Sequence, residues 1–90
     1  MAERKQYEVQ GIEFDVNADK LAGWKVFNML KEARDADDEY DKVSAVMGIA
    51  CYITECTEGE FVDKCGGEDA PVADIINVAT QLIMAAYPKN

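Results

Sequence analysis

Apolar and polar residues alternate over residues 6–16, near the start of the chain. The apolar members of this alternation are Tyr7, Val9, Ile12, Phe14 and Val16. Gln10 and Gly11 separate its two halves, and glycine supplies the positive φ that a two-residue hairpin turn requires. The pattern predicts a short β-hairpin with one apolar face, which is stable only when helices cover that face.

After residue 17 the apolar period lengthens to that of a helix. The period predicts four helices, at about 18–33, 40–55, 58–65 and 71–87. In the first of them, Asn17 or Asp19 is the expected N-cap, and Gly23 is an interior residue that costs about 1 kcal/mol relative to alanine. Its expected apolar stripe is Leu21, Trp24, Phe27 and Leu30. The last helix has the longest stripe, formed by Val72, Ile75, Ile76, Ala79, Leu82, Ile83 and Ala86.

Capping signals mark the ends of the predicted helix 58–65 and the start of the predicted helix 71–87. Thr57 and Glu60 have the spacing of a capping box, and Gly66-Gly67 predicts the end of the third helix. Asp69 is the expected acidic cap of the last helix, with Pro71 near its start. Residues 1–90 are therefore expected to form a single domain of α+β class, mostly α, with a short N-terminal β-hairpin followed by a small bundle of about four helices.

The segment RDADDEYDKV, residues 34–43, holds five acidic side chains and has two interpretations. Its first carboxylates match positions 1, 3 and 5 of a calcium-binding EF-hand loop. Tyr40 stands where that loop needs glycine, however, and Val46 stands where it needs a bidentate glutamate. The mismatch favours a solvated connection whose acidic residues begin the second helix, where the helix dipole stabilises negative charge. These residues are Asp37, Asp38, Glu39 and Asp41.

Composition narrows the classes of function. Eighteen acidic and nine basic residues give a net charge of −9, which disfavours binding to nucleic acid or to an anionic membrane. The longest uncharged stretch, residues 75–88, is too short to span a bilayer, and the charged start MAERKQYEVQ has no apolar signal segment. An odd number of cysteines argues against a disulfide framework and favours a cytoplasmic, reducing compartment.

The residues needed for catalysis or metal binding are scarce. The chain has no histidine, which removes Ser-His and Cys-His nucleophilic sites and most zinc sites. Cys51 and Cys56 are five residues apart and would point roughly 140° away from each other on one helix. Ser44 lies in KVSAV, without the Asp-Ser-Leu attachment site of an acyl carrier. We therefore expect that the protein is not an enzyme and that it has no catalytic residue, no metal and no cofactor.

The order of these features resembles the tail assembly chaperones of long-tailed bacteriophages, especially those of Gram-positive hosts. The hairpin YEVQGIEFDV, the tryptophan-containing helix LAGWKVFNML, an acidic break and the last apolar stripe VADIINVATQLI carry the resemblance over nearly the whole chain. It implies a non-enzymatic protein of the host bacterial cytoplasm, absent from the finished virion. Such a protein coats the aggregation-prone tape measure protein and helps tail tube subunits polymerise around it.

A chaperone for a helical client needs exposed apolar residues, and the same residues at helical spacing also fit a core. The candidate partner-binding residues are Trp24, Ile76, Leu82, Ile83 and Tyr87. We also expect self-association through the last helix. The resemblance further implies a longer, frameshifted form that recruits the tail tube protein. Pro88-Lys89-Asn90 can be encoded by CCA AAA AAC, a codon set that would permit the slip, whereas most synonymous codons would not. A solvated C-terminus is the plainer explanation of the same residues and is the one we favour.

Two other functions stay open at this point. The first is an acidic DNA mimic or anti-defence inhibitor that occupies the site of a basic nucleic-acid-processing protein. The nine basic residues interrupt the acidic ones and count against a continuous phosphate-like face. The second is a host regulatory adaptor, which the sequence neither supports nor excludes.

Overall fold

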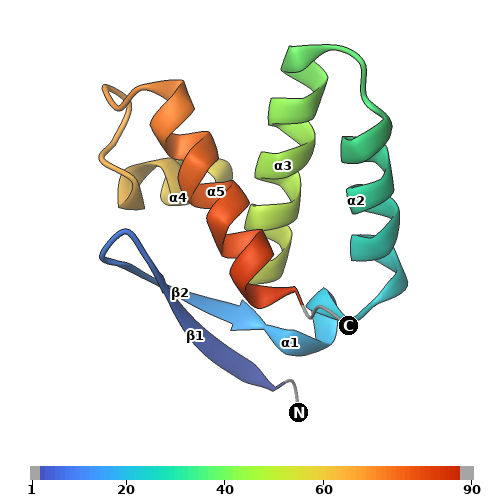
Figure 1. Ribbon diagram of the computed structural model, residues 1–90. Helices are drawn as coiled ribbons and strands as arrows, with labels where there is room; N and C mark the ends of the chain where they lie inside the picture. Colours follow the sequence, from blue (N-terminus) through green and yellow to red (C-terminus); the bar gives the residue numbers. More distant parts are fainter. Residues whose placement is uncertain (1–2, 88–90) are drawn as a thin grey trace.

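The computed structural model describes residues 3–87 and confirms the α+β, mostly α class (Figure 1). An N-terminal two-stranded hairpin is followed by helices, and in the described residues the elements are β1 (Arg4–Val9), β2 (Ile12–Asn17), α1 (Ala18–Leu21), α2 (Trp24–Asp35), α3 (Glu39–Thr54), α4 (Glu58–Lys64) and α5 (Val72–Ala86). The predicted candidates for a frameshift site, Pro88-Lys89-Asn90, lie outside the described residues.

The hairpin is confirmed and is slightly longer than the alternation predicted. Its strands are antiparallel, with Tyr7 opposite Phe14 and Val9 opposite Ile12. Gln10 and Gly11 have φ values of 53° and 81°, so both turn residues are left-handed, as a two-residue turn matching the strand twist requires. The apolar face of the hairpin is thereby directed toward the helices.

The predicted helix 18–33 is wrong as a single element, because the chain divides it at Gly23. Asn17 caps the short α1, its side chain accepting hydrogen bonds from the backbone N–H groups of Asp19 and Lys20 at 3.0 and 3.2 Å. Gly23 then takes an extended conformation, φ −83° and ψ 166°, and becomes the N-cap of α2. Glycine loses the most backbone entropy in a helix interior, so this is the position where a break costs least.

The remaining helix boundaries agree with the predictions within a residue. The Thr57–Glu60 capping box is present, with reciprocal hydrogen bonds of 2.8 and 3.1 Å. Gly66 and Gly67 have positive φ values of 118° and 90° just beyond α4 and confirm the predicted stop. The predicted cap at Asp69 is wrong, because Pro71 is the N-cap of α5 and no side chain caps that end.

The acidic segment begins α3, as its position before the helix predicted. Asp38 is the N-cap, and its carboxylate accepts a hydrogen bond of 3.0 Å from the backbone N–H of Tyr40. Glu39 and Asp41 lie in the first turn of the helix, near the positive end of its dipole. Charge–dipole interaction and capping thus explain most of this acidic segment.

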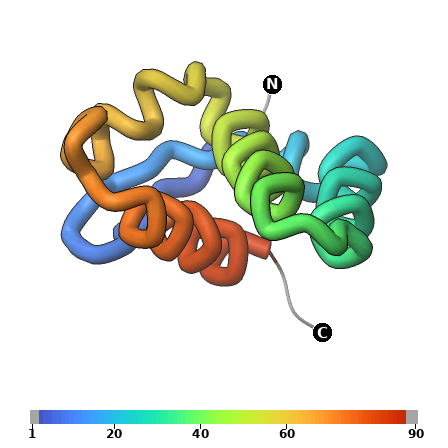
Figure 2. The backbone as a smooth tube through the Cα atoms, turned by 90° about the horizontal axis from the view of Figure 1, so that it is seen from above, coloured from blue at the N-terminus to red at the C-terminus, as the bar shows by residue number. Residues whose placement is uncertain are grey.

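The core forms where the hairpin, α3 and α5 meet. In Figure 1, α2 and α3 run antiparallel beside each other, α5 packs against α3, and both α3 and α5 contact the hairpin. Figure 2 gives the same arrangement from above. Phe14 of β2 stacks on Phe61 of α4 with ring centroids 5.1 Å apart, which fastens the hairpin to the helices. The buried apolar residues are Val9, Phe14, Val16, Leu21, Val26, Met47, Ile49, Ala50, Ile53, Phe61, Ile75, Val78, Ala79, Leu82, Ile83 and Ala86.

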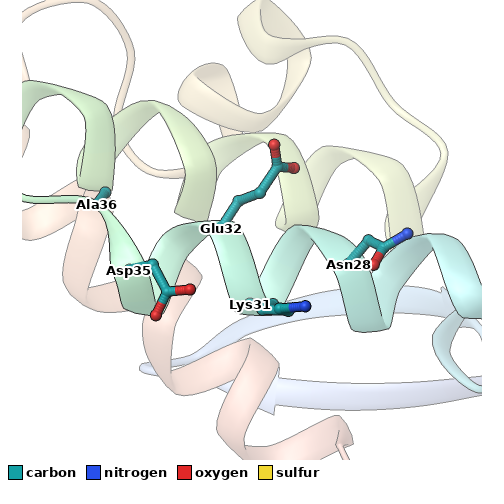
Figure 3. Close-up of a pocket in the computed structure, with 5 residues that line it drawn as sticks. All are labelled: Asn28, Lys31, Glu32, Asp35 and Ala36. Atoms are coloured by element: carbon teal, nitrogen blue, oxygen red, sulfur yellow. The ribbon is translucent and has the colours of Figure 1, made fainter.

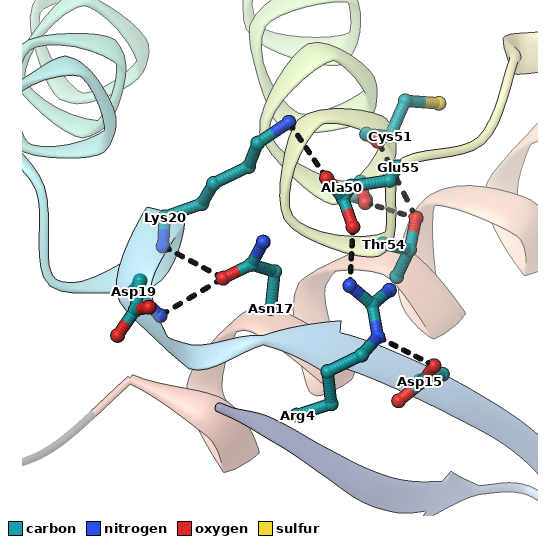
Figure 4. A network of polar contacts seen from close by, with 9 residues as sticks. All are labelled: Arg4, Asp15, Asn17, Asp19, Lys20, Ala50, Cys51, Thr54 and Glu55. Atoms are coloured by element: carbon teal, nitrogen blue, oxygen red, sulfur yellow. Dashed lines mark hydrogen bonds and ion pairs between the residues drawn. The ribbon is translucent and has the colours of Figure 1, made fainter. Parts of the chain in front are cut away.

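A polar network ties the start of the hairpin to the end of α3 (Figure 4). Arg4 of β1 donates to Asp15 of β2 at 2.8 Å and also to Glu55, while Lys20 of α1 pairs with Glu55 at 3.1 Å. The hydrogen bonds from Arg4, and then from Lys20, lower the pKa of Glu55 to about 2. Glu55 is also the C-cap of α3 and has a left-handed conformation with φ 57°. Glycine adopts this conformation more easily, so the network holds glutamate at a position that would favour glycine.

Candidate partner-binding surfaces

The structure separates the five predicted partner-binding residues into core and surface. Leu82 and Ile83 are 0% and 8% exposed, so the proposal of a client-facing role for them is wrong in this fold. They face the core because α5 packs against both α3 and β1, which leaves this side of the helix no free surface. Trp24 is 72% exposed, whereas Ile76 and Tyr87 are half-buried at the edge of the core.

Trp24 and Phe27 form an exposed aromatic pair on α2. Their ring centroids are 5.1 Å apart, and Phe27 is 46% exposed. The sequence pattern placed both side chains in one apolar stripe and left open whether Trp24 belonged to the core or to a partner-binding surface; in the structure both rings are exposed. Because α2 restarts at Gly23, Val26 turns toward the core in their place.

A hollow adjoins the aromatic pair and lies between α2 and Tyr87, the residue that follows α5. This hollow has a volume of about 320 Å³ and is lined by Phe27, Leu30, Lys31, Arg34 and Tyr87. We call Trp24, Phe27, Leu30 and Tyr87 together the aromatic surface. It combines apolar rings with a basic edge, a composition typical of protein-binding patches. Phe27 and Leu30 were not predicted to contact a partner. The tendency of Gly23 to break a helix is the sequence signal that could have indicated their position on this surface.

A second apolar depression lies between the N-terminal halves of α3 and α5 and helix α4. Its volume is about 220 Å³. We call it the helix-start groove, and it is lined by Tyr40, Val43, Ser44, Met47, Glu58, Val62, Val72, Ile75 and Ile76. Tyr40 and Val72 are 76% and 65% exposed, so apolar area at the groove is open to solvent. Of the predicted partner-binding residues, Ile76 belongs to this groove, and Trp24 and Tyr87 belong to the aromatic surface.

A third hollow runs along α2 and is lined mostly by polar residues (Figure 3). It has a volume of about 570 Å³ and is lined by Asn28, Lys31, Glu32, Asp35 and Ala36. In Figure 3 the Glu32 side chain points away from those of Lys31 and Asp35. Groups that act together in catalysis must converge on one reacting atom, and these side chains diverge.

The cysteines are closer together than helical spacing predicted. The expected 140° separation assumed one helix through both residues, but α3 ends at Thr54, and after the left-handed Glu55 the backbone N–H of Cys56 donates back to the carbonyl of Cys51 at 3.2 Å. Burial, followed by the interaction with Cys56, raises the pKa of the Cys51 thiol to about 12. Burial also raises the pKa of Cys65. Such thiols stay protonated at neutral pH and are poor nucleophiles.

Within residues 3–87, no cluster of three or more His, Cys, Asp or Glu side chains is arranged to hold a metal ion. None of the helices in the same range combines the length and the hydropathy needed to cross a membrane. Comparison of the chain with protein-family models, with curated proteins and with solved structures found no match.

Proposed function

We propose that this protein is a tail assembly chaperone of a long-tailed bacteriophage, which binds the tape measure protein and keeps it soluble while the tail is assembled. The order of the elements supports the proposal, because a hairpin, a tryptophan-containing helix, an acidic break and a last apolar helix follow one another as in that family. In this proposal the protein acts in the host cytoplasm and is absent from the finished virion.

The observation that carries the proposal is the exposed aromatic surface. Trp24 and Phe27 lie side by side on α2 with most of the tryptophan in solvent, and Tyr87 and Leu30 extend the apolar area beyond them. Tryptophan and tyrosine are the residues most enriched among those that dominate binding energy at protein interfaces. A helix of the tape measure protein that covers this surface removes its own apolar stripe from water at the same time.

The charge of the protein fits the second task of a chaperone, which is to keep the complex in solution. A net charge of −9 on 90 residues gives mutual repulsion between complexes, and acidic residues favour solubility more than basic ones do. A frameshifted longer form would add recruitment of the tail tube protein. That part of the proposal concerns the chain beyond residue 87.

Co-expression with a tape measure fragment tests the proposal. The fragment alone is expected in the insoluble fraction, and together with the protein it is expected to stay soluble and to co-purify. The double variant Trp24→Ala, Phe27→Ala should lose most of this solubilisation, because it removes both rings of the exposed pair. Met84→Ala is the matched control, since Met84 is 57% exposed and lines neither apolar depression.

Salt dependence separates the chaperone from the acidic DNA mimic. Association through apolar side chains should persist near half-molar salt, whereas a mimic held by charge would dissociate from its basic target as salt screens the interaction. Binding only to a nuclease or another basic nucleic-acid-processing protein, lost at high salt, would overturn the proposal.

A further inference from the structure

The geometry and charge of the helix-start groove point to a second docking site, which takes an amphipathic helical segment whose apolar face is flanked by lysine or arginine. This inference rests on the proposed function, because it names the chemistry of a partner segment that a chaperone of this fold would hold. It concerns the groove between α3, α4 and α5 and is independent of the aromatic surface on α2.

The groove presents apolar side chains from three helices at once. Val43 and Met47 line it from α3, Val62 from α4, and Ile76 from α5, so each of the three helices contributes apolar side chains. In Figure 1 the first turns of α3 and α5 stand apart while their later turns approach each other. The residues that line the groove come from the N-terminal halves of these two helices and from α4. Its volume of about 220 Å³ is below the roughly 300–1,000 Å³ of small-molecule sites and suits the insertion of individual side chains from a helix.

The surroundings of the groove are acidic. Glu58 is the one charged residue among those that line it. The first turns of the three helices that meet there carry Glu39, Asp41, Glu58, Glu60 and Asp74. Helix α5, Val72–Ala86, contains no lysine or arginine, and Lys42 of α3 is the one basic residue in these three first turns. A partner with flanking basic residues gains attraction from these carboxylates, and an acidic partner is repelled.

The opposite charge at the aromatic surface makes the two sites distinguishable. Lys31 and Arg34 line the hollow beside Phe27 and Tyr87, and Arg34 is paired with Asp35 at 3.2 Å, so a basic segment meets no carboxylate among the lining residues of this hollow and is favoured at the groove. One partner can therefore be directed to one site by its charge alone.

A synthetic peptide of leucine and lysine tests the inference. Its leucines are spaced i, i+3, i+4 and i+7, so that they form one face of a helix, and a fluorescent label reports binding by anisotropy. We expect saturable binding to the protein. Two control peptides should not bind: one with glutamate in place of every lysine, and one of the same composition with the leucines dispersed.

Paired variants then locate the site. Val72→Gln, in the groove, should weaken peptide binding about tenfold, and Met84→Gln, on the same helix outside the groove, should change it less than about twofold. Both side chains are more than half exposed, so both variants should fold, which circular dichroism checks. Glu58→Gln should weaken binding and flatten its salt dependence, whereas Glu32→Gln on α2 should do neither.

The outcomes separate this inference from the proposed function. If Val72→Gln and Glu58→Gln bind the peptide as well as the unaltered protein does, the groove is not the docking site, and solubilisation of the tape measure fragment is unaffected by that result. Loss of peptide binding in Trp24→Ala alone would move the site to the aromatic surface and overturn the inference. A change in sedimentation with Val72→Gln but not in peptide binding would show that a second copy of the chain occupies the groove.

Discussion

Leu82 and Trp24 belong to the same set of sequence-predicted partner-binding residues, and the structure predicts opposite consequences when each is replaced by alanine. Leu82 is fully buried, so Leu82→Ala removes core contacts and leaves a cavity. Such replacements cost about 2–5 kcal/mol. A chain of 90 residues has a free energy of unfolding on the order of 5–13 kcal/mol, so the variant should fold but be much less stable.

Trp24→Ala should affect stability far less. Because Trp24 is 72% exposed, roughly a quarter of its surface is covered. At about 25 cal/mol per Å² for a side chain of ~250 Å², that cover is worth about 1.5 kcal/mol, and the better helix propensity of alanine offsets part of the loss. The net cost is about 1 kcal/mol.

Thermal unfolding followed by circular dichroism measures both effects. For a domain of this size each kcal/mol shifts Tm by about 4–8 °C, so Leu82→Ala should lower Tm by about 8–40 °C and Trp24→Ala by about 4–8 °C. Binding of the tape measure fragment, measured well below both transitions, should show the reverse order: Trp24→Ala weakens it and Leu82→Ala leaves it nearly unchanged. Equal Tm values for Leu82→Ala and the unaltered protein would refute the assignment of Leu82 to the core. A fall for Trp24→Ala as large as that expected for Leu82→Ala would refute the exposed position of the tryptophan.

Three further predictions follow from local features. Since the pKa of Glu55 is lowered to about 2 from an ordinary value of 4.5, its ion pairs stabilise the fold above pH 4.5 and are lost as pH falls toward 2. The Tm difference between the protein and Glu55→Gln should therefore be largest at neutral pH and vanish near pH 2. A Tm difference that does not change with pH would contradict the network with Arg4. Since the pKa of Cys51 is raised from 9.0 to about 12, iodoacetamide at pH 8 should alkylate Cys51 about a thousandfold more slowly in the folded protein than in guanidinium. Mass spectrometry of the peptide that contains Cys51 measures the two rates. Similar rates would show that the thiol is not buried. Millimolar calcium should leave Tm unchanged, because the segment 34–43 begins a helix; a rise of about 10 °C, corresponding to about 2.7 kcal/mol at a hundredfold excess over Kd, would show a specific site.

The features that could be predicted from the sequence depend on residues only a few positions apart. The turn at Gln10-Gly11, the Asn17 cap and the Thr57–Glu60 capping box were all predicted, and each is made by hydrogen bonds or backbone angles within about four residues. The acidic start of α3 belongs with them, since the dipole of one helix accounts for it.

The candidate site could be predicted only in part. Trp24, Ile76 and Tyr87 were named from helical spacing and lie at or near the surface, but Leu82 and Ile83 were named on the same grounds and are in the core. Helical spacing shows that residues share a face, and it does not show what covers that face. The relation of Cys51 to Cys56 failed for a different reason, because the expected separation assumed that α3 continues past Thr54.

The sequence alone therefore determined the class of the fold, the hairpin register and most helix ends, because turn angles, caps and dipoles act between neighbours in the chain. Only the tertiary structure decided which apolar residues meet solvent. The break at Gly23 turns Val26 inward and Trp24 and Phe27 outward, and the packing of α5 against both α3 and the hairpin buries Leu82. Whether a residue is buried depends on packing between elements that are distant in sequence. The surface available to a partner is therefore defined only after those elements have packed.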